Sequence, residues 1–334
     1  MAVRVGINGF GRIGMLTAKA AMQNAPDVEI VAVNDLAPMD GMALLFKRDT
    51  VHGIWPEDVS VDGNIMRVGD HEIKTFSERD PAQIPWGDVG VDVVVESTGI
   101  FTNREGAAKH LEGGAKKVVV SAPAKGADAT FVYKVNHETY DPASHDVVSN
   151  SSCTTNCIIP MVKVLQENFG IESGYMTTIH AFTNDQSLLD TAHKDPRRAR
   201  SAPMNIIPTS TGAARTAAVI YPELEGRIDG MALRVPVPDG SITDFVARVE
   251  SEVSVEEVNN AFKQAASGDL ADVLEYSEAP IVSSDIVGNP NSCIFDSKLT
   301  MSTGRNVKVF GWYDNEWGYS NRTVDIVRFI GKKL

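Results

Sequence analysis

The first part of the chain alternates short runs of β-branched residues with longer stretches of helical spacing. Continuous apolar runs of this kind are typical of strands that are buried on both faces of a parallel sheet. The expected strands are Val3 to Asn8, Ile30 to Asn34, Val91 to Glu96, Lys117 to Ser121 and Asp146 to Ser149. We therefore predict a parallel sheet with crossover helices over about the first 150 residues.

The pattern changes after the small, polar segment 151–156. Residues 157–169 have helical spacing, and a strand-like run over Tyr175 to Phe182 follows. Further on, Gly230 to Val237 and Thr243 to Ser251 alternate apolar with polar residues, which favours an antiparallel sheet with one covered face. An α/β domain followed by an α+β domain is the predicted architecture.

The predicted domains are residues 1–151 and 152–317. A last helix, 318–334, has a basic end and is expected to pack back on the first domain. Between the strands of the second domain, 183–205 is polar, basic around Arg198, and lacks a clear period. Ordered loops of that length are usually functional.

Composition narrows the class of protein. The formal net charge of −13 is spread along the sequence, so we expect no nucleic-acid partner and no membrane partner. No apolar run is long enough for a membrane span, and the start lacks the pattern of a signal peptide. Three cysteines, at 153, 157 and 293, argue for a reducing compartment, so a cytoplasmic enzyme is expected.

The segment Gly9-Phe10-Gly11-Arg12-Ile13-Gly14 directly follows the first expected strand and opens a helix. Glycines in this context permit a tight turn and let backbone amides approach a pyrophosphate at the helix start. Asp35 ends the next strand, where its carboxylate can accept hydrogen bonds from ribose hydroxyls. The sequence therefore predicts a dinucleotide site here.

Cys153 stands at the expected start of a helix, where the macrodipole favours a thiolate. His180 ends a strand-like run in the same domain, and a histidine beside such a cysteine lowers the thiol pKa and supplies a base. Taken alone, each has a simpler interpretation, since free cysteines are commonly buried hydrophobic residues and histidines commonly structural. Cys153 and Cys157 lack further ligands at metal-site spacing, so no metal is predicted.

Five segments together resemble the glyceraldehyde-3-phosphate dehydrogenase family, and the resemblance runs from end to end. They are Asn8 to Gly14, Ser151-Ser152-Cys153-Thr154-Thr155-Asn156-Cys157, Thr177 to His180, Arg234-Val235-Pro236 and Trp312-Tyr313-Asp314-Asn315-Glu316-Trp317-Gly318-Tyr319-Ser320. The resemblance implies an N-terminal Rossmann-type parallel sheet with an α+β catalytic domain of mostly antiparallel sheet. It also implies oxidation and phosphorylation of glyceraldehyde 3-phosphate to 1,3-bisphosphoglycerate through a cysteine thioester, in glycolysis or gluconeogenesis.

The resemblance assigns roles to individual positions. Cys153 is similar to the family's nucleophile and His180 to its base. The residues implied in cofactor binding are Gly9, Phe10, Gly11, Arg12, Ile13, Gly14, Asp35, Ser121, Asn315 and Tyr319. The residues implied in binding the substrate and inorganic phosphate are Ser152, Thr154, Thr183, Arg198, Thr211, Gly212 and Arg234. Members are usually homotetramers.

Two features of the sequence favour different nicotinamide cofactors. Asp35 favours NAD because a carboxylate repels the 2′-phosphate of NADP. The Leu-Pro pair that covers this region in NAD-specific relatives is here Thr191-Ala192, which leaves space and a hydroxyl for a phosphate, while Leu36 remains apolar. We therefore expect NAD to be favoured and NADP also to be accepted. Strict NAD use, with Thr191-Ala192 as neutral change, is the alternative.

Two other functions remain open at this point. Erythrose-4-phosphate dehydrogenase is the nearest rival enzyme, although it departs from the Thr-Asn-Asp-Gln pattern present at 183–186. A binding protein on an inactive dehydrogenase fold is the rival from another class. Met15 and Pro196 also depart from the family's usual residues, arginine and leucine respectively.

Overall fold

The computed structural model describes residues 2–334. Two compact units divide the chain. The first ends at Tyr133, resumes over His137–Ser152 and closes with Ser320–Leu334, and the second comprises Lys134–Asn136 and Cys153–Tyr319. No helix within residues 2–334 is long and apolar enough to cross a membrane.

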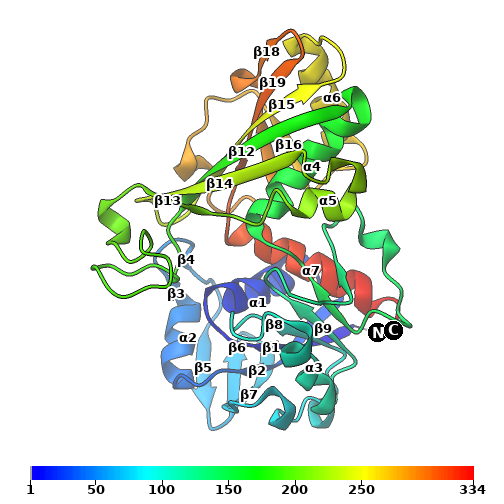
Figure 1. Ribbon diagram of the computed structural model, residues 1–334. Coiled ribbons are helices and arrows are strands. Elements are labelled where there is room, and N and C mark those ends of the chain that lie inside the picture. The colour runs from blue at the N-terminus through cyan, green and yellow to red at the C-terminus, as the bar shows by residue number, and fades with distance from the viewer. Residues whose placement is uncertain (1) are drawn as a thin grey trace. The chain divides into compact units, whose positions relative to one another are not determined.

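The first unit is built on a nine-stranded sheet (Figure 1). From edge to edge its strands are β10 (Ala129–Thr130), β11 (Val147–Ser149), β9 (Lys117–Val120), β8 (Val93–Glu96), β1 (Val3–Asn8), β2 (Val28–Asn34), β7 (His71–Phe76), β6 (Ile65–Val68) and β5 (Val59–Asp62). All pairs from β10 to β7 are parallel, which confirms the predicted parallel sheet. The antiparallel edge of β5 and β6, turned at Gly63 with φ +60°, was not predicted.

Three helices belong to this sheet's connections: α1 (Arg12–Asn24), α2 (Met39–Lys47) and α3 (Arg104–Glu112). A short hairpin of β3 (Arg48–Asp49) and β4 (Gly53–Ile54) follows α2. The central strands β1 and β8 consist mostly of side chains that are almost fully buried, because helices cover a parallel sheet on both faces. This burial explains why both strands are continuous apolar runs in the sequence.

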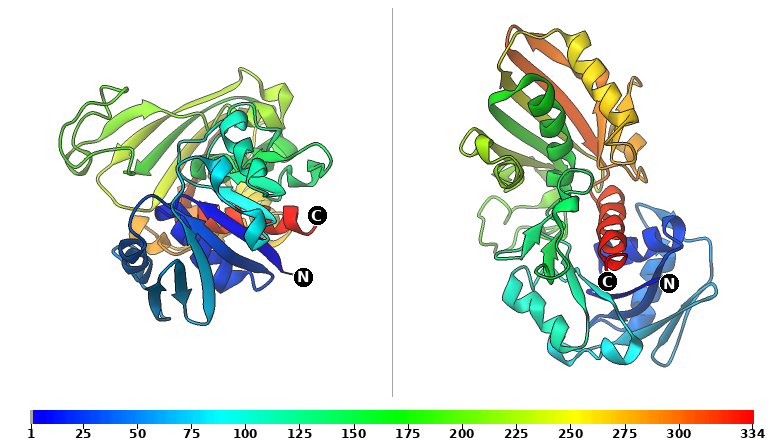
Figure 2. Two further views of the ribbon diagram at one scale, coloured as in Figure 1. Left: turned by 90° about the horizontal axis from the view of Figure 1, so that it is seen from below. Right: turned by 90° about the vertical axis from the view of Figure 1, so that its right-hand side faces the viewer.

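The second unit is built on an eight-stranded, mostly antiparallel sheet. Its strands in spatial order are β13 (Ile207–Ser210), β14 (Ile228–Val235), β12 (Ile171–Ala181), β15 (Ser241–Val249), β19 (Asn306–Tyr313), β17 (Cys293–Asp296) and β16 (Leu274–Ser277), with β18 (Met301–Thr303) beside β19. Buried and accessible positions alternate along β15, and α4 (Cys153–Phe169) and α6 (Val255–Ser267) pack on this sheet (Figure 2). The predicted sheet with one covered face is confirmed.

Two pairings depart from the antiparallel pattern, β16 with β17 and β12 with β14, and the second matters for the site. Strands β12 and β14 run parallel, with His180 directly opposite Arg234. Since both strands end one residue after this pair, the two side chains lie on one face of the sheet, at the carboxyl ends of the two strands.

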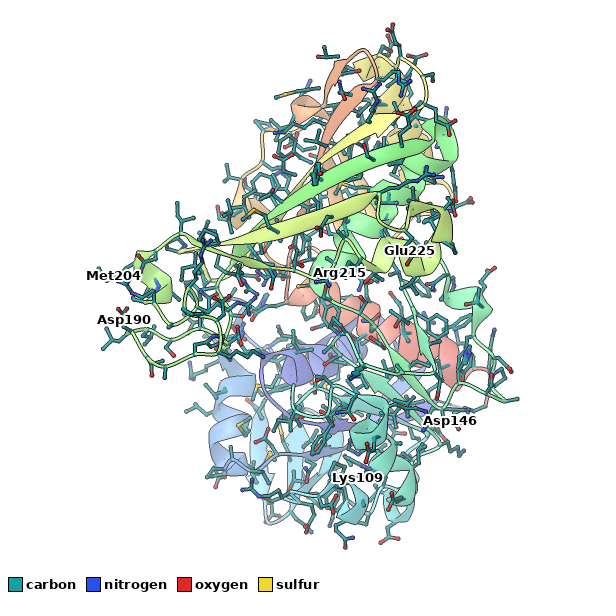
Figure 3. The ribbon with its side chains drawn as sticks, in the orientation of Figure 1. Lys109, Asp146, Asp190, Met204, Arg215 and Glu225 are labelled. Atoms are coloured by element: carbon teal, nitrogen blue, oxygen red, sulfur yellow. The ribbon has the colours of Figure 1, made fainter. Side chains whose placement is uncertain are left out.

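The remaining elements are short, apart from the last helix. They are α5 (Thr216–Ile220), α7 (Trp317–Gly331) and the 3₁₀ turns η1 (Pro81–Gln83), η2 (Gly87–Val89), η3 (His137–Thr139), η4 (Ala202–Met204), η5 (Pro222–Leu224), η6 (Ser283–Ile286) and η7 (Ser297–Leu299). Between β12 and η4 the chain forms the expected long loop, on which Asp190 is labelled in Figure 3. On this loop the carboxylate of Asp190 forms an ion pair with the guanidinium of Arg200, with Nε 2.7 Å from Oδ2.

Candidate active site

The expected glycine turn lies where β1 passes into α1. Gly9 has φ +88°, and a Cβ there would lie 2.6 Å from the backbone nitrogen of Thr98. A Cβ on Gly14 would lie 2.2 Å from the carbonyl oxygen of Gly9. A Cβ on Gly11, in contrast, would have no neighbouring atom within 4 Å. The first and third glycines are therefore required by the turn and by packing. The second leaves open space, as the approach of a pyrophosphate requires.

A pocket of about 360 Å³ opens beside this turn, at the carboxyl ends of β1, β2 and β8. Its walls include Gly9, Gly11 and Asp35 from the expected cofactor residues. They also include Thr98 and Arg79, which sequence reasoning missed. Both residues could have been predicted from their place in the sequence, since each follows a strand of the parallel sheet. Loops that follow neighbouring parallel strands meet at the same end of the sheet. The residues present fit a dinucleotide.

The other cofactor residues expected in this unit are placed as follows. The carboxylate of Asp35 accepts hydrogen bonds from the backbone nitrogens of Phe10, at 2.8 Å, and Ala37, at 2.9 Å. Phe10 is fully buried and packs on Phe46. Arg12 forms an ion pair with Asp49 at 3.1 Å. Ile13 lies within α1 and Ser121 directly follows β9. Neither these two nor Phe10, Arg12 and Gly14 are among the residues that line the pocket described above.

Cys153 is the first residue of α4, as expected. The chain reaches it from β11 through a tight turn in which Ser151, a non-glycine residue, has φ +57°. The Ser151 nitrogen donates to the hydroxyl of Ser149 at 3.0 Å, which holds the turn. Strained backbone of this kind is concentrated at functional sites.

The structure brings Cys153 and His180 together. The thiol Sγ lies 3.4 Å from Nε2 of the imidazole, whose Nδ1 lies 2.7 Å from the carbonyl oxygen of Ala181. Because a carbonyl only accepts, Nδ1 carries the proton and Nε2 is left as an acceptor facing the thiol. His180 can therefore take the thiol proton.

The pKa of the Cys153 thiol is shifted in the direction opposite to that expected at a helix start. Burial raises the pKa of the Cys153 thiol to about 11, although the Arg234 guanidinium acts in the opposite direction. Burial, assisted by the same guanidinium, lowers the pKa of His180 to about 3. Each group alone thus resists charging. Proton transfer from Cys153 to His180 creates both charges together, so that their attraction offsets the loss of solvation.

Arg234 is the cation nearest this pair. Its Nη1 lies 3.1 Å from the Thr183 hydroxyl, 3.1 Å from the Ala181 carbonyl oxygen and 3.3 Å from Nδ1 of His180. Its Nε is buried and has no hydrogen-bond partner. A buried guanidinium with unused donors beside a hydroxyl is a suitable site for an anion.

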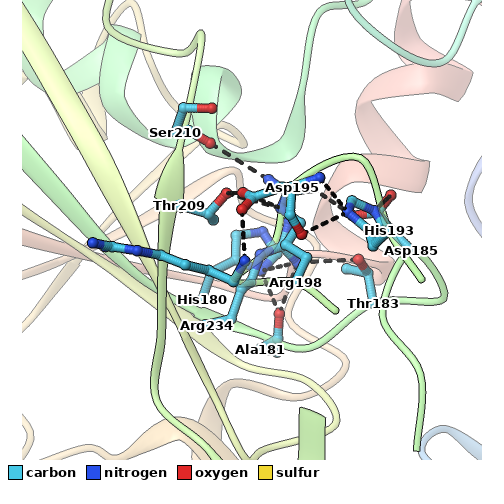
Figure 4. A network of polar contacts seen from close by, with 11 residues as sticks. His180, Ala181, Thr183, Asp185, His193, Asp195, Arg198, Thr209, Ser210 and Arg234 are labelled. Atoms are coloured by element: carbon cyan, nitrogen blue, oxygen red, sulfur yellow. Dashed lines mark hydrogen bonds and ion pairs between the residues drawn. The ribbon is translucent and has the colours of Figure 1, made fainter. Parts of the chain in front are cut away.

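Arg198 lies in the neighbouring network shown in Figure 4. Its guanidinium forms an ion pair with Asp185 and donates from Nε to the Thr209 hydroxyl at 2.9 Å. Thr209 in turn donates to Asp195 at 2.7 Å. Arg198 is thus held in place by carboxylates, whereas no ion pair is described for Arg234.

The hydroxyl of Tyr313 links two threonines behind the thiol. It lies 2.9 Å from the Thr154 hydroxyl and 2.7 Å from the Thr178 hydroxyl, and its ring packs edge-on against His180. The expected phosphate ligand Thr154 is buried and is engaged by this contact. Tyr313 was missed as a site residue because its partners are distant in the sequence.

The remaining expected residues lie on several segments. Asn315 accepts from the Ser241 hydroxyl at 2.6 Å, and Tyr319 is buried in α7. Ser152 immediately precedes α4, and Thr211 and Gly212 directly follow β13. Thr191, Ala192 and Pro196 are exposed on the long loop, and Met15 is buried in α1. Nothing in the structure explains the proline.

A Rossmann-type sheet with a dinucleotide pocket, together with a thiol–imidazole pair, defines an NAD-dependent oxidoreductase. Residues 3–104 match the model of the glyceraldehyde 3-phosphate dehydrogenase NAD-binding domain, and residues 152–315 match that of its C-terminal domain. The chain belongs to the glyceraldehyde-3-phosphate dehydrogenase family.

Similar proteins agree along the whole chain. It is 58% identical to glyceraldehyde-3-phosphate dehydrogenase 2 of Streptomyces avermitilis over 335 residues, all of each chain. It is 58% identical to the glyceraldehyde-3-phosphate dehydrogenase of Streptomyces coelicolor over 336 residues, which cover all of both chains. It is 56% identical to the glyceraldehyde-3-phosphate dehydrogenase of Geobacillus stearothermophilus over 334 residues, which cover all of this chain and 99% of that protein. The function is therefore NAD-dependent, phosphorylating oxidation of glyceraldehyde 3-phosphate in glycolysis, and neither the rival erythrose-4-phosphate activity nor an inactive binding protein is needed to explain the chain.

Proposed function

We propose that Cys153 carries the aldehyde's carbon as a covalent intermediate and that His180 moves the protons. The observation that carries the proposal is the 3.4 Å contact between Sγ and an acceptor Nε2. As sulfur attacks the aldehyde, His180 takes the thiol proton and returns it to the new oxygen, which gives a hemithioacetal. The backbone nitrogen of Cys153, at the start of α4, supports the developing oxyanion.

The second half of the reaction conserves the oxidation energy. His180 removes the hemithioacetal hydroxyl proton while hydride leaves the same carbon, and a thioester remains on Cys153. NAD, when bound, supplies the hydride acceptor. Inorganic phosphate then attacks the thioester carbonyl, the thiolate leaves and recovers a proton from His180, and 1,3-bisphosphoglycerate is released.

The anion sites divide between the two arginines. In our proposal Arg234 and Thr183 bind the substrate's own phosphate, supported by the unpartnered buried Nε of Arg234. Arg198, with Ser152, Thr154, Thr211 and Gly212, serves inorganic phosphate. The Thr154 hydroxyl also contacts the hydroxyl of Tyr313 at 2.9 Å.

The cofactor residues of this proposal are those that the family resemblance implies. The domain of residues 1–151, with helix 318–334, binds the dinucleotide through Gly9 to Gly14, Asp35 and Ser121, while Asn315 orients the nicotinamide carboxamide beside Tyr319. Residues 152–317 form the catalytic domain. NADP is also accepted, since Arg79 brings a guanidinium to the pocket wall that Asp35 and Leu36 share.

Two further proposals concern the assembly and the compartment. A homotetramer is supported by apolar side chains exposed on the long loop and on the uncovered sheet face, including Leu188, Leu189, Met204 and Tyr175. A cytoplasmic location is supported by three free cysteines, two of them buried.

Mass spectrometry of the protein tests the covalent step. Mixing the enzyme with glyceraldehyde 3-phosphate and NAD, without phosphate, and quenching in acid should add one phosphoglyceroyl group to the peptide that contains Cys153. Cys153→Ser should bind NAD as the unaltered protein does, add no acyl group and lose roughly 10⁴-fold or more of its activity. An acyl group on another residue, or turnover by the serine variant, would refute the assignment.

A further inference from the structure

A chain of buried polar side chains connects the carboxyl ends of β8, β1 and β2, which are adjacent strands of the sheet. Its centre is Glu96, the last residue of β8, which is 1% exposed. Asn8 is the register partner of Glu96 on β1, and Asn34 is the partner of Asn8 on β2. The side chains of these three residues therefore share one face of the sheet.

Four donors converge on the carboxylate of Glu96. Oε1 accepts from the backbone nitrogen of Thr98 at 2.8 Å and from its hydroxyl at 2.5 Å. Oε2 accepts from Nδ2 of Asn8 at 2.6 Å and lies 2.9 Å from Nε2 of His110. A buried carboxylate is thus stabilised by hydrogen bonds, with no arginine or lysine among these partners.

The direction of the chain is fixed at its first end by Trp86. The indole nitrogen, which can only donate, lies 3.0 Å from Nδ1 of His110. Nδ1 therefore carries no proton, and the neutral imidazole carries it on Nε2, where it is donated to Glu96. Trp86 and His110 are both fully buried, so no solvent reverses this direction.

The direction is fixed at the other end by the backbone of Glu78. Its nitrogen donates to Oδ1 of Asn34 at 2.7 Å, which turns Nδ2 of Asn34 toward Oδ1 of Asn8 at 2.8 Å. Nδ2 of Asn8 then has to face Glu96. The indole N–H of Trp86 and the backbone N–H of Glu78 can only donate, so the direction of every hydrogen bond between them is fixed. The side chain at position 96 therefore has to accept on both of its oxygens, as a carboxylate does.

The members of this chain also form the pocket. Asn8, Asn34, Glu78 and Thr98 all line it, and the Thr98 hydroxyl accepts from the nitrogen of Ile100 at 3.1 Å. We infer that Glu96 is a positioning residue for the dinucleotide, which holds opposite walls of the pocket, the 97–101 loop and the Asn34–Glu78 pair, in the binding arrangement. The inference rests on the proposal that NAD occupies this pocket.

The substitution Glu96→Gln tests this role, because in either orientation the new NH2 group faces N–H donors, those of Asn8 and His110 or the backbone N–H of Thr98. The free protein relieves that conflict by moving the pocket walls, and NAD binding has to restore them. Calorimetric titration should therefore show an NAD Kd raised roughly tenfold or more. KM for NAD should rise in parallel, while kcat with saturating substrates and KM for the aldehyde stay within about twofold.

A second variant tests the direction of the hydrogen bonds. Trp86→Phe frees Nδ1 of His110 to carry the proton, so that Nε2 can accept from the amide that Glu96→Gln introduces. The double variant should bind NAD more tightly than Glu96→Gln, although Trp86→Phe alone brings no gain over the unaltered protein. Thr98→Val removes one of the four donors to Glu96 and the acceptor of the Ile100 N–H, and leaves the bonds of Asn8 and His110 in place. This milder change should raise the Kd for NAD by roughly threefold.

The outcomes are separable. If the unaltered protein binds no NAD, the proposed function fails. If it binds NAD and Glu96→Gln binds it equally well, even with a lower melting temperature, Glu96 supports the fold and not the pocket. If Trp86→Phe restores no affinity to Glu96→Gln, the assigned proton positions are wrong. Either of these last two results overturns the inference while leaving the proposed function intact.

Discussion

The two units treat buried polar groups in opposite ways. Around Glu96, every donor has an acceptor, and the network is complete without a ligand. Around His180 a donor remains unused, since Nε of Arg234 is buried without a partner, while its Nη1 donates to the Ala181 carbonyl and the Thr183 hydroxyl. A complete network holds the shape of a pocket, whereas an incomplete one is prepared to bind an anion and move a proton.

The largest effect in this comparison is expected from His180→Gln, which removes the acceptor at the thiol. Activity should fall by ~10²–10⁴-fold. Without the imidazole, Cys153 keeps its raised pKa of about 11, so little thiolate exists at neutral pH and more forms as the pH rises toward that value. Alkylation by iodoacetamide should then be slow at pH 7 and accelerate about tenfold per pH unit, whereas the unaltered protein reacts readily at neutral pH.

The contrary result is easily recognised. If His180→Gln is alkylated at pH 7 as fast as the unaltered protein, another group accepts the thiol proton. The role assigned to the 3.4 Å contact would then be lost.

A smaller effect is expected from Arg234→Leu, which removes the incomplete network's cation. The value of kcat/KM for glyceraldehyde 3-phosphate should fall by roughly 10²-fold, as expected for a charge-assisted pair, and that for unphosphorylated glyceraldehyde far less. Arg200→Leu is the matched control, because that exposed arginine pairs only with Asp190 in the interactions described for it. Equal losses for both aldehydes would exclude Arg234 from the substrate-phosphate site.

The smallest effect concerns the choice between NAD and NADP. We expect NADP to support turnover with a kcat/KM lower than that of NAD by less than ~10³-fold. Thr191→Leu combined with Ala192→Pro should raise the preference for NAD by roughly tenfold, by closing the space for the 2′-phosphate. A preference beyond ~10³-fold in the unaltered protein would establish strict NAD use.

The sequence predicted those parts of the site that depend on neighbouring residues. The strand, turn and helix around Gly9 to Gly14, and the helix start at Cys153, follow from local patterns and are present in the structure. The two sheets were also predicted in type, because burial on one or both faces determines the spacing of apolar residues.

The parts that were not predicted depend on pairings distant in the sequence. His180 and Arg234 meet only because β12 and β14 run parallel, and Glu96 and Asn8 meet only through the β8–β1 register. The direction of the thiol's pKa shift was also missed, since burial depends on the tertiary structure and here outweighs the effect of the helix start. No local pattern contains this information.

The most direct test of the account is the dependence of NADH formation on phosphate. With glyceraldehyde 3-phosphate and NAD but no phosphate, absorbance should rise by about one NADH per chain and then nearly stop, because the thioester on Cys153 has no acceptor. Adding phosphate or arsenate should restore steady turnover. Steady turnover without either anion, or the absence of an initial burst, would contradict a thioester that waits for phosphate.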